Sequence, residues 1–127
     1  MIKLNNKGQS LVMFVLILPI ILLMFALVYD IGNAILHKQE LDNINYLTVE
    51  YGLDHINEDD LEGKLMDMIN INDNTLNEII VLVRNDKIQI TTKKSVNGMF
   101  IKNFEILEIK SSYEGYMKDN KKIIERV

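Results

Sequence analysis

The chain has 127 residues, a net charge of −4 and no cysteine. This length suffices for one small domain, and the lack of cysteine excludes disulfides, thiolate metal sites and cysteine nucleophiles. All 18 acidic residues lie at or beyond Asp30. The acidic character of that part disfavours nucleic-acid binding, because phosphate contacts need a basic face.

The N-terminal segment is a candidate membrane anchor. Leu11–Tyr29 contains no charged residue and would span about 28 Å as a helix, close to the bilayer hydrocarbon thickness of about 30 Å. A cleaved secretory signal is the alternative. Its apolar region would be shorter, about 7–15 residues, and would end in a small-residue cleavage site, which residues 25–30 do not offer. We therefore expect a basic leader over residues 1–8 and a single-pass transmembrane helix over residues 9–30.

The basic residues of the leader predict the orientation of this anchor. Lys3 and Lys7 precede the apolar run, and no acidic residue accompanies them. Short basic tails stay in the cytoplasm. We expect a cytoplasmic N-terminus in a bacterial cell membrane and an extracytoplasmic C-terminal domain.

Residues 31–56 are predicted to continue the helix beyond the membrane. Lys38 and Asn45 interrupt the apolar face of this extension. That face could pack on the chain's own domain or on neighbouring copies, and the pattern leaves both open. The face comprises Ala34, Leu41, Ile44, Leu47 and Tyr51.

Residues 57–127 are predicted to form a small α+β domain that begins with a helix. Asn57 is the expected N-cap, with the acidic residues 58–60 in the first helical turn. The Asn-rich residues 70–74 follow this helix, but they lack the glycine and glutamate that a calcium loop requires and indicate a solvated turn. The apolar face of this helix comprises Leu61, Leu65, Met66 and Ile69.

An antiparallel sheet of about three strands is predicted to follow. Residues 78–84 and 87–93 flank Asn85-Asp86, a pair that tolerates positive φ in a tight turn. A two-residue loop would place Val83 opposite Ile88, Val81 opposite Ile90 and Ile79 opposite Thr92 on one apolar face. A third strand is expected from Phe104 to about Tyr116, with a bulge at Ile106-Leu107. Residues 118–127 are expected to be a charged tail.

We find no pattern typical of catalysis. His37 and His55, the only histidines, are eighteen residues apart and lack metal-ligand spacing. The glycine-rich and serine-centred motifs of nucleotide-binding proteins and hydrolases do not occur. We expect no enzyme activity, no catalytic residue, and no cofactor, metal or small-molecule substrate.

The N-terminal sequence resembles a known family. Lys7–Pro19 contains a glycine followed by an apolar run, and Asp30-Ile31-Gly32 follows it. Together these residues resemble the TadE-like pseudopilins of tight-adherence (Tad/Flp) pili over about the first 50 residues. The residues on corresponding positions are Val12, Phe14, Leu16, Pro19, Asp30 and Gly32.

The resemblance implies processing by a prepilin peptidase. Cleavage after Gly8 would leave Gln9 as the mature N-terminus. The family usually has Glu where this chain has Met13, and that carboxylate pairs subunits within the membrane. Met13 implies either a minor component or a chain that is not processed in the usual way. Pro19 removes one helical hydrogen bond and would let the helix bend during assembly.

The function implied is that of a minor pilin-like or pseudopilin-like component of a Tad-type pilus or related secretion machine. Its partners would be the membrane and other pilus subunits, contacted through Met13, Pro19 and the apolar face of the helical extension. The alternative is a membrane-anchored accessory protein of another cell-envelope complex.

Overall fold

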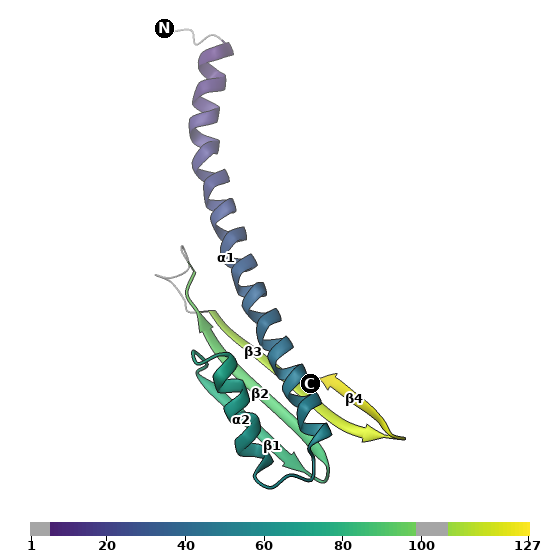
Figure 1. Cartoon of the computed structure of the whole chain (residues 1–127). Coiled ribbons are helices and arrows are strands. Elements are labelled where there is room, and N and C mark those ends of the chain that lie inside the picture. The colour runs from purple at the N-terminus through teal and green to yellow at the C-terminus, as the bar shows by residue number, and fades with distance from the viewer. Residues whose placement is uncertain (1–5, 99–106) are drawn as a thin grey trace.

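The computed structural model describes residues 6–98 and 107–127. A single helix, α1 (Asn6–Asp54, 49 residues), runs from the N-terminal end to the C-terminal domain (Figure 1). The second helix, α2, is shorter (Leu61–Asn72). Four strands follow, and all neighbouring strands are antiparallel. They are β1 (Glu78–Arg84), β2 (Lys87–Val96), β3 (Leu107–Lys118) and β4 (Lys121–Arg126).

The predicted fold class is confirmed: a long apolar helix precedes a small antiparallel sheet. The first hairpin has the predicted register, since Val83 pairs with Ile88, and Val81 pairs with Ile90. Asn85 and Asp86 have φ values of 51° and 62°, as a two-residue turn with positive φ at both positions requires.

The prediction of about three strands and a charged tail was wrong, because residues 121–126 form β4. Asp119 and Asn120 have the same φ values, 51° and 62°, as the turn of the first hairpin. They reverse the chain so that Ile124 pairs with Gly115. The described part of the predicted third strand is β3, which runs from Leu107 to Lys118; residues 104–106, with half of the expected bulge, lie outside the described residues.

The start of α2 also differs from the prediction. Asn57 does not cap this helix; the N-cap is Asp60, which has φ 53° and whose side chain makes no capping hydrogen bond. The backbone amide of Glu58 donates to the carbonyl of His55 (3.0 Å), so the turn that ends α1 continues past the expected cap. Met66 was expected on the buried face but is 40% exposed. The buried residues of α2 follow an i, i+4 pattern: Leu61, Leu65 and Ile69.

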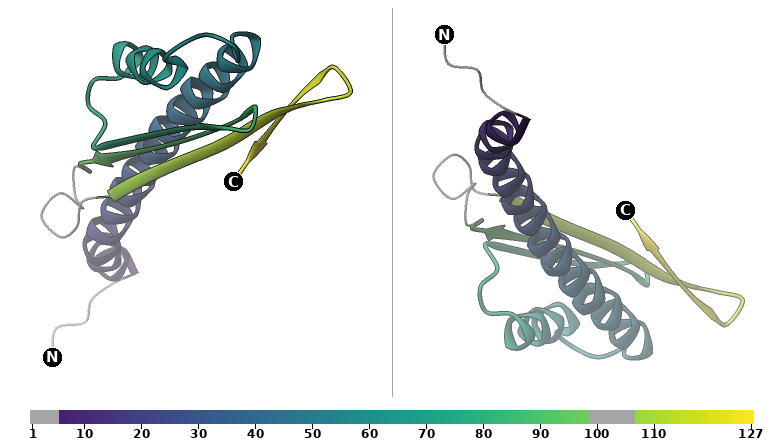
Figure 2. Two further views of the ribbon diagram at one scale, coloured as in Figure 1. Left: turned by 90° about the horizontal axis from the view of Figure 1, so that it is seen from below. Right: turned by 90° about the horizontal axis from the view of Figure 1, so that it is seen from above.

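The core lies between one face of the sheet and the two helices. Figure 2 shows α2 and the C-terminal end of α1 on the same side of the sheet. Gly115 lets α1 approach β3 closely, because a Cβ there would collide with Val49 Cγ1. Gly52 serves the same approach from the helix, since its Cβ would lie 2.6 Å from Ile88 Cδ1. The main buried cluster comprises Val49, Leu53, Leu61, Leu65, Ile69, Val81, Ile88 and Ile90.

Candidate functional site

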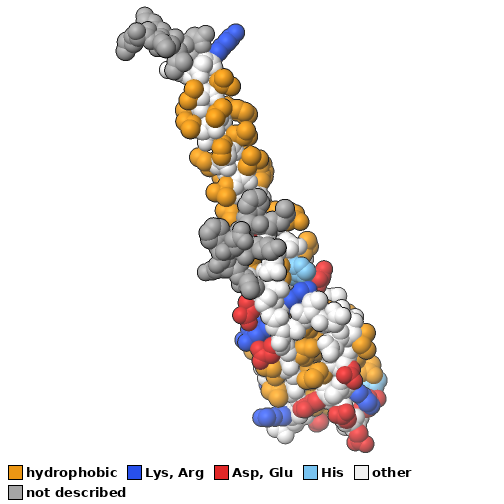
Figure 3. Space-filling model, turned by 90° about the vertical axis from the view of Figure 1, so that its left-hand side faces the viewer, with side chains coloured by type: hydrophobic (Ala, Val, Ile, Leu, Met, Phe, Trp, Pro, Cys, Tyr) orange, Lys and Arg blue, Asp and Glu red, His pale blue; other side chains and the backbone are white. Residues whose placement is uncertain are grey.

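The N-terminal half of α1 is an apolar surface that the rest of the chain leaves uncovered. Figure 3 shows hydrophobic side chains along the projecting part of this helix, whereas charged side chains gather on the domain. Met13 is 55% exposed and Phe25 is 68% exposed, and Ala26 is the only buried residue of the described part that precedes Asp30. The helix is long and apolar enough to cross a membrane, and almost all of its most apolar stretch is exposed.

The predicted processing residues lie in the first turn of this helix. Because α1 begins at Asn6, the peptide bond between Gly8 and Gln9 is already helical. The hydroxyl of Ser10 donates to the carbonyl of Asn6 (2.9 Å) and closes this turn. Any cleavage after Gly8 would therefore require the first turn to open.

Pro19 does not interrupt α1, which is continuous on both sides of it. Its ring cannot donate the hydrogen bond that the carbonyl of Val15 would otherwise accept. Pro19 and Met13 are both exposed, and they lie on the part of the helix that projects from the domain. Neither residue therefore serves the packing of the chain's own core.

The predicted packing face of the helical extension coincides only in part with the face that contacts the sheet. Leu41 is fully buried in a small cluster with Val96 and Ile109, and Ala34 packs against it. Ile44 packs on the main cluster. Leu47 is 52% exposed and takes no part in either cluster. The face that contacts the sheet is rotated towards residues that the sequence pattern treated as interruptions.

Asn45 is the clearest of those residues. Its side chain is fully buried, and its amide donates to Thr92 Oγ1 (2.9 Å) and to the carbonyl of Ser111 (3.2 Å). Among the described residues, its Oδ1 is the one buried side-chain polar atom without a hydrogen-bond partner. Asn45 is a polar residue that interrupts an apolar pattern, and nothing in the sequence indicated that it would contact β2 and β3.

A carboxylate on α1 ties the helix to β3 and β4. Asp42, whose side chain is 12% exposed, accepts a hydrogen bond from Ser111 Oγ (2.5 Å) and pairs with Arg126 (3.1 Å). Arg126 also donates to the hydroxyl of Tyr113 (3.2 Å). This bond, followed by the charge of Asp42, raises the pKa of Arg126. Sequence reasoning missed this cluster because Arg126 was assigned to a charged tail.

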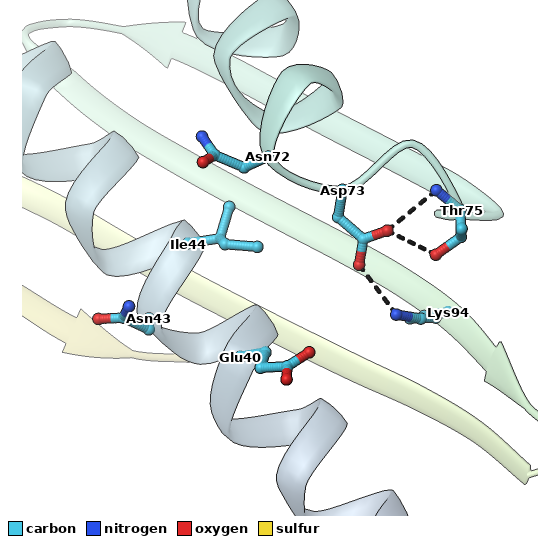
Figure 4. A pocket seen from close by; sticks show the side chains of 7 residues that line it. All are labelled: Glu40, Asn43, Ile44, Asn72, Asp73, Thr75 and Lys94. Carbon is cyan, nitrogen blue, oxygen red and sulfur yellow. Dashed lines mark hydrogen bonds and ion pairs between the residues drawn. The ribbon is translucent and has the colours of Figure 1, made fainter.

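A second polar cluster lies in a pocket of about 390 Å³ between α1, β2 and the turn after α2 (Figure 4). Lys94 Nζ lies 3.0 Å from Asp73 Oδ2 and 3.2 Å from His37 Nδ1. Asp73 also accepts hydrogen bonds from the amide and hydroxyl of Thr75. Burial alone would raise the pKa of Asp73, but the hydrogen bonds from Thr75 and Lys94 outweigh it and hold that pKa below its usual value.

The two buried charges of this pocket are paired with each other. Lys94 supplies the positive charge that Asp73 needs, and the side chains of both residues are at most 13% exposed. The Asn-rich turn therefore orders itself around an internal ion pair. Within the described ranges, no three His, Asp or Glu side chains are grouped so that they could hold a metal ion.

Asp30 marks the point where α1 meets the domain. Its side chain is 1% exposed and lies against Gly98, where an added Cβ would be 2.7 Å from Asp30 Oδ2. Gly98 follows the last residue of β2 by two positions. Gly98 therefore leaves room for this carboxylate just after the end of β2, at the C-terminal limit of the uncharged apolar run.

The N-terminal part of the chain matches a known protein family. The family model described as TadE-like protein matches residues 8–44. The match begins at the predicted processing glycine and covers both the exposed apolar half of α1 and its first contacts with the sheet. No curated protein and no solved structure matches the chain.

Proposed function

From the TadE-like segment that residues 8–44 form, we propose that the chain is a minor pilin-like structural or assembly component of a Tad-type pilus or related secretion machine. The observation that carries the proposal is that this segment lies wholly on α1. Most of its surface is apolar and uncovered, as an element that contacts lipid and other subunits requires.

The proposed topology has the N-terminus in the cytoplasm and the sheet on the outside. Lys3 and Lys7 support it through the rule that basic flanks stay inside. Protease added to intact protoplasts should then digest the C-terminal domain. Full protection of that domain would contradict the proposed orientation.

We propose that a prepilin peptidase cleaves after Gly8. Gly8→Val should leave a precursor that is heavier by the eight-residue leader, because a side chain at this position obstructs the protease. Met13→Glu should leave cleavage unchanged and alter incorporation into the machine, because the carboxylate serves subunit pairing. Mass spectrometry of the N-terminal peptide from native membranes measures both variants; equal masses with Met1 retained would remove the support for processing.

The deciding experiment is deletion of the gene in the bacterium that carries it. Loss of Tad pili, restored by the wild-type chain, is expected. Met13 favours one competing function, that of an accessory protein of another envelope complex, because it lacks the pairing carboxylate. Normal pili in the deletion strain, together with co-purification of a different membrane complex, would support that competitor.

A further inference from the structure

Gly32 has no role in the packing of the described chain, unlike the other glycines whose surroundings are described. Gly52 leaves room for Ile88 of β2, and Gly115 leaves room for Val49 of α1. Gly63 and Gly98 leave room for the carboxylates of Asp60 and Asp30. A Cβ at Gly32 would meet nothing within 4 Å. Its φ is not positive, so the backbone does not require glycine there. Glycine in a helix interior lowers the stability of the helix. Because no contact within the described chain requires glycine at position 32, we look for a contact with another molecule.

The helix surface around Gly32 is apolar and faces away from the sheet. Gly32 precedes Leu41 by nine residues, which is two and a half helical turns, so it lies on the side of α1 opposite the fully buried Leu41. Val28 and Leu36, one turn to either side, are 66% and 59% exposed. We call this surface the back strip; it comprises Phe25, Val28, Gly32, Leu36 and Gln39.

The back strip is free of charge although this part of α1 is not. Asp30, Lys38 and Asp42 lie on the side of the helix that faces the domain, where each is at least partly buried. Glu40 is 65% exposed and lies about a quarter turn from Gly32, beside the strip, where its carboxylate is 3.6 Å from His37 Nδ1. Two identical back strips can therefore face each other with no charged residue at the line of contact itself. The uncharged apolar run ends at Tyr29, so contact with lipid alone would not require an uncharged strip beyond that residue. The strip nevertheless continues about 10 Å further, to Leu36.

We infer that the back strip is the contact surface for α1 of a second copy of this chain, with the two helices parallel and crossing at Gly32. The inference rests on the proposed function for the common membrane orientation of both copies. Gly32 facing Gly32 lets the two backbones approach closely, and Val28 and Leu36 pack above and below the crossing. The sheet and α2 lie on the other side of α1 and do not obstruct it (Figure 2).

A second copy fits the strip better than lipid or an unrelated helix. Lipid tails do not require a glycine, because they adapt to any apolar surface. A two-fold contact must be complementary to itself, and a neutral strip with one small residue between larger apolar ones meets that condition.

Disulfide cross-linking tests the contact, because the chain has no native cysteine. The full-length chain would be reconstituted into vesicles of phosphatidylethanolamine and phosphatidylglycerol and oxidised with copper phenanthroline. Val28→Cys and Leu36→Cys lie on the strip. Ile31→Cys and Glu40→Cys are matched controls, since they lie about a quarter turn to either side and are similarly exposed, at 53% and 65%.

We expect at least fivefold more disulfide-linked dimer from the two strip variants than from the two controls. Adding Gly32→Leu to Leu36→Cys should lower the dimer yield at least fivefold, and Gly32→Ala should lower it less. Circular dichroism of each variant checks that the helix is retained; if Gly32→Leu loses helix, the Gly32→Ala result decides.

Three results would overturn the inference: equal yields from all four positions, no dimer from any, or a cross-link in native membranes only to a different protein. The last would assign the strip to another subunit. Because the purified chain is tested without pilus machinery, a failure here leaves the proposed function standing. Conversely, a deletion strain with normal pili would leave the dimer result standing.

Discussion

The two halves of α1 differ in what covers them. Before Asp30, apolar side chains surround the helix on every side and almost all are exposed. From Asp30 onward, one side is buried against β2 and β3, and the buried residues include the polar Asn45 and Thr48. One unbroken helix thus carries a surface that fits a membrane and a surface that fits one particular sheet.

The comparison shows that the two halves obtain their specificity differently. An apolar surface in lipid tolerates exchange among apolar residues, because the tails adapt to it. The sheet-facing half is held by directed bonds, such as those of Asn45 and Asp42, and by the close approach at Gly115. A substitution that disables one half should therefore leave the other half functional.

The largest effect is expected in the sheet-facing half. Leu41→Asp should lower the free energy of unfolding by about 3–5 kcal/mol, because it removes a buried side chain and leaves a buried unpaired charge. Leu47→Asp is the matched control. It lies on the same sequence-predicted face but is 52% exposed, so a change within about 0.5 kcal/mol is expected.

Denaturant unfolding of the full chain in detergent micelles measures both variants, and membrane fractionation should show both still anchored. Equal destabilisation by the two substitutions would show that Leu47 is buried as Leu41 is. The helix would then have no exposed side at this position.

The next largest effect is expected in the projecting half. Leu22→Lys places a charge near the middle of the apolar run and should disfavour membrane insertion by about 2.5–3.5 kcal/mol. Ser10→Lys, at the end of the run, should have little effect because its ammonium group can reach the interface. The fraction of chain that resists alkaline extraction from membranes measures insertion. If Leu22→Lys stays fully inserted, another subunit covers that position.

The smallest effect concerns acid stability at the domain pocket. The pKa of Asp73 is held below its ordinary value by Thr75 and Lys94 against the opposing effect of burial. The resulting stabilisation is complete above about pH 4, the pKa of Asp in an unfolded chain, and is lost as pH falls through the lower folded-state pKa.

Asp73→Asn should therefore destabilise the domain at pH 6 and flatten the decline in stability towards pH 2. Unfolding curves at both pH values, with the exposed Asp59→Asn as the control, measure the difference. An unchanged acid dependence in Asp73→Asn would show that the ion pair with Lys94 contributes nothing to folding.

Local patterns predicted the hairpin and its register because alternation and turn residues are encoded within a few positions. The same turn signal occurs at Asp119-Asn120, but Ile123 and Ile124 are adjacent rather than alternating, and charged residues flank them. The sequence therefore hid β4. Its pairing with β3 became evident only from the register that places Ile124 opposite Gly115.

The polar residues between α1 and the sheet could not be predicted in this way. Asn45 departs from the apolar periodicity, and its partners Thr92 and Ser111 are 47 and 66 residues away. Asp42 pairs with Arg126 across 84 residues. Such contacts depend on how strands meet the helix in three dimensions, and a one-dimensional period carries no information about them.

The continuity of α1 from the projecting end into the core determines how the molecule bears mechanical load. A pull on the projecting end acts along the helix axis, and α1 runs lengthwise over the sheet (Figure 1). The contacts from Asp30 to Leu53 cover about 35 Å and would be sheared together rather than peeled apart one by one. Tension would thus be distributed over the whole helix–sheet interface, with no flexible linker between the pulled segment and the domain to absorb it.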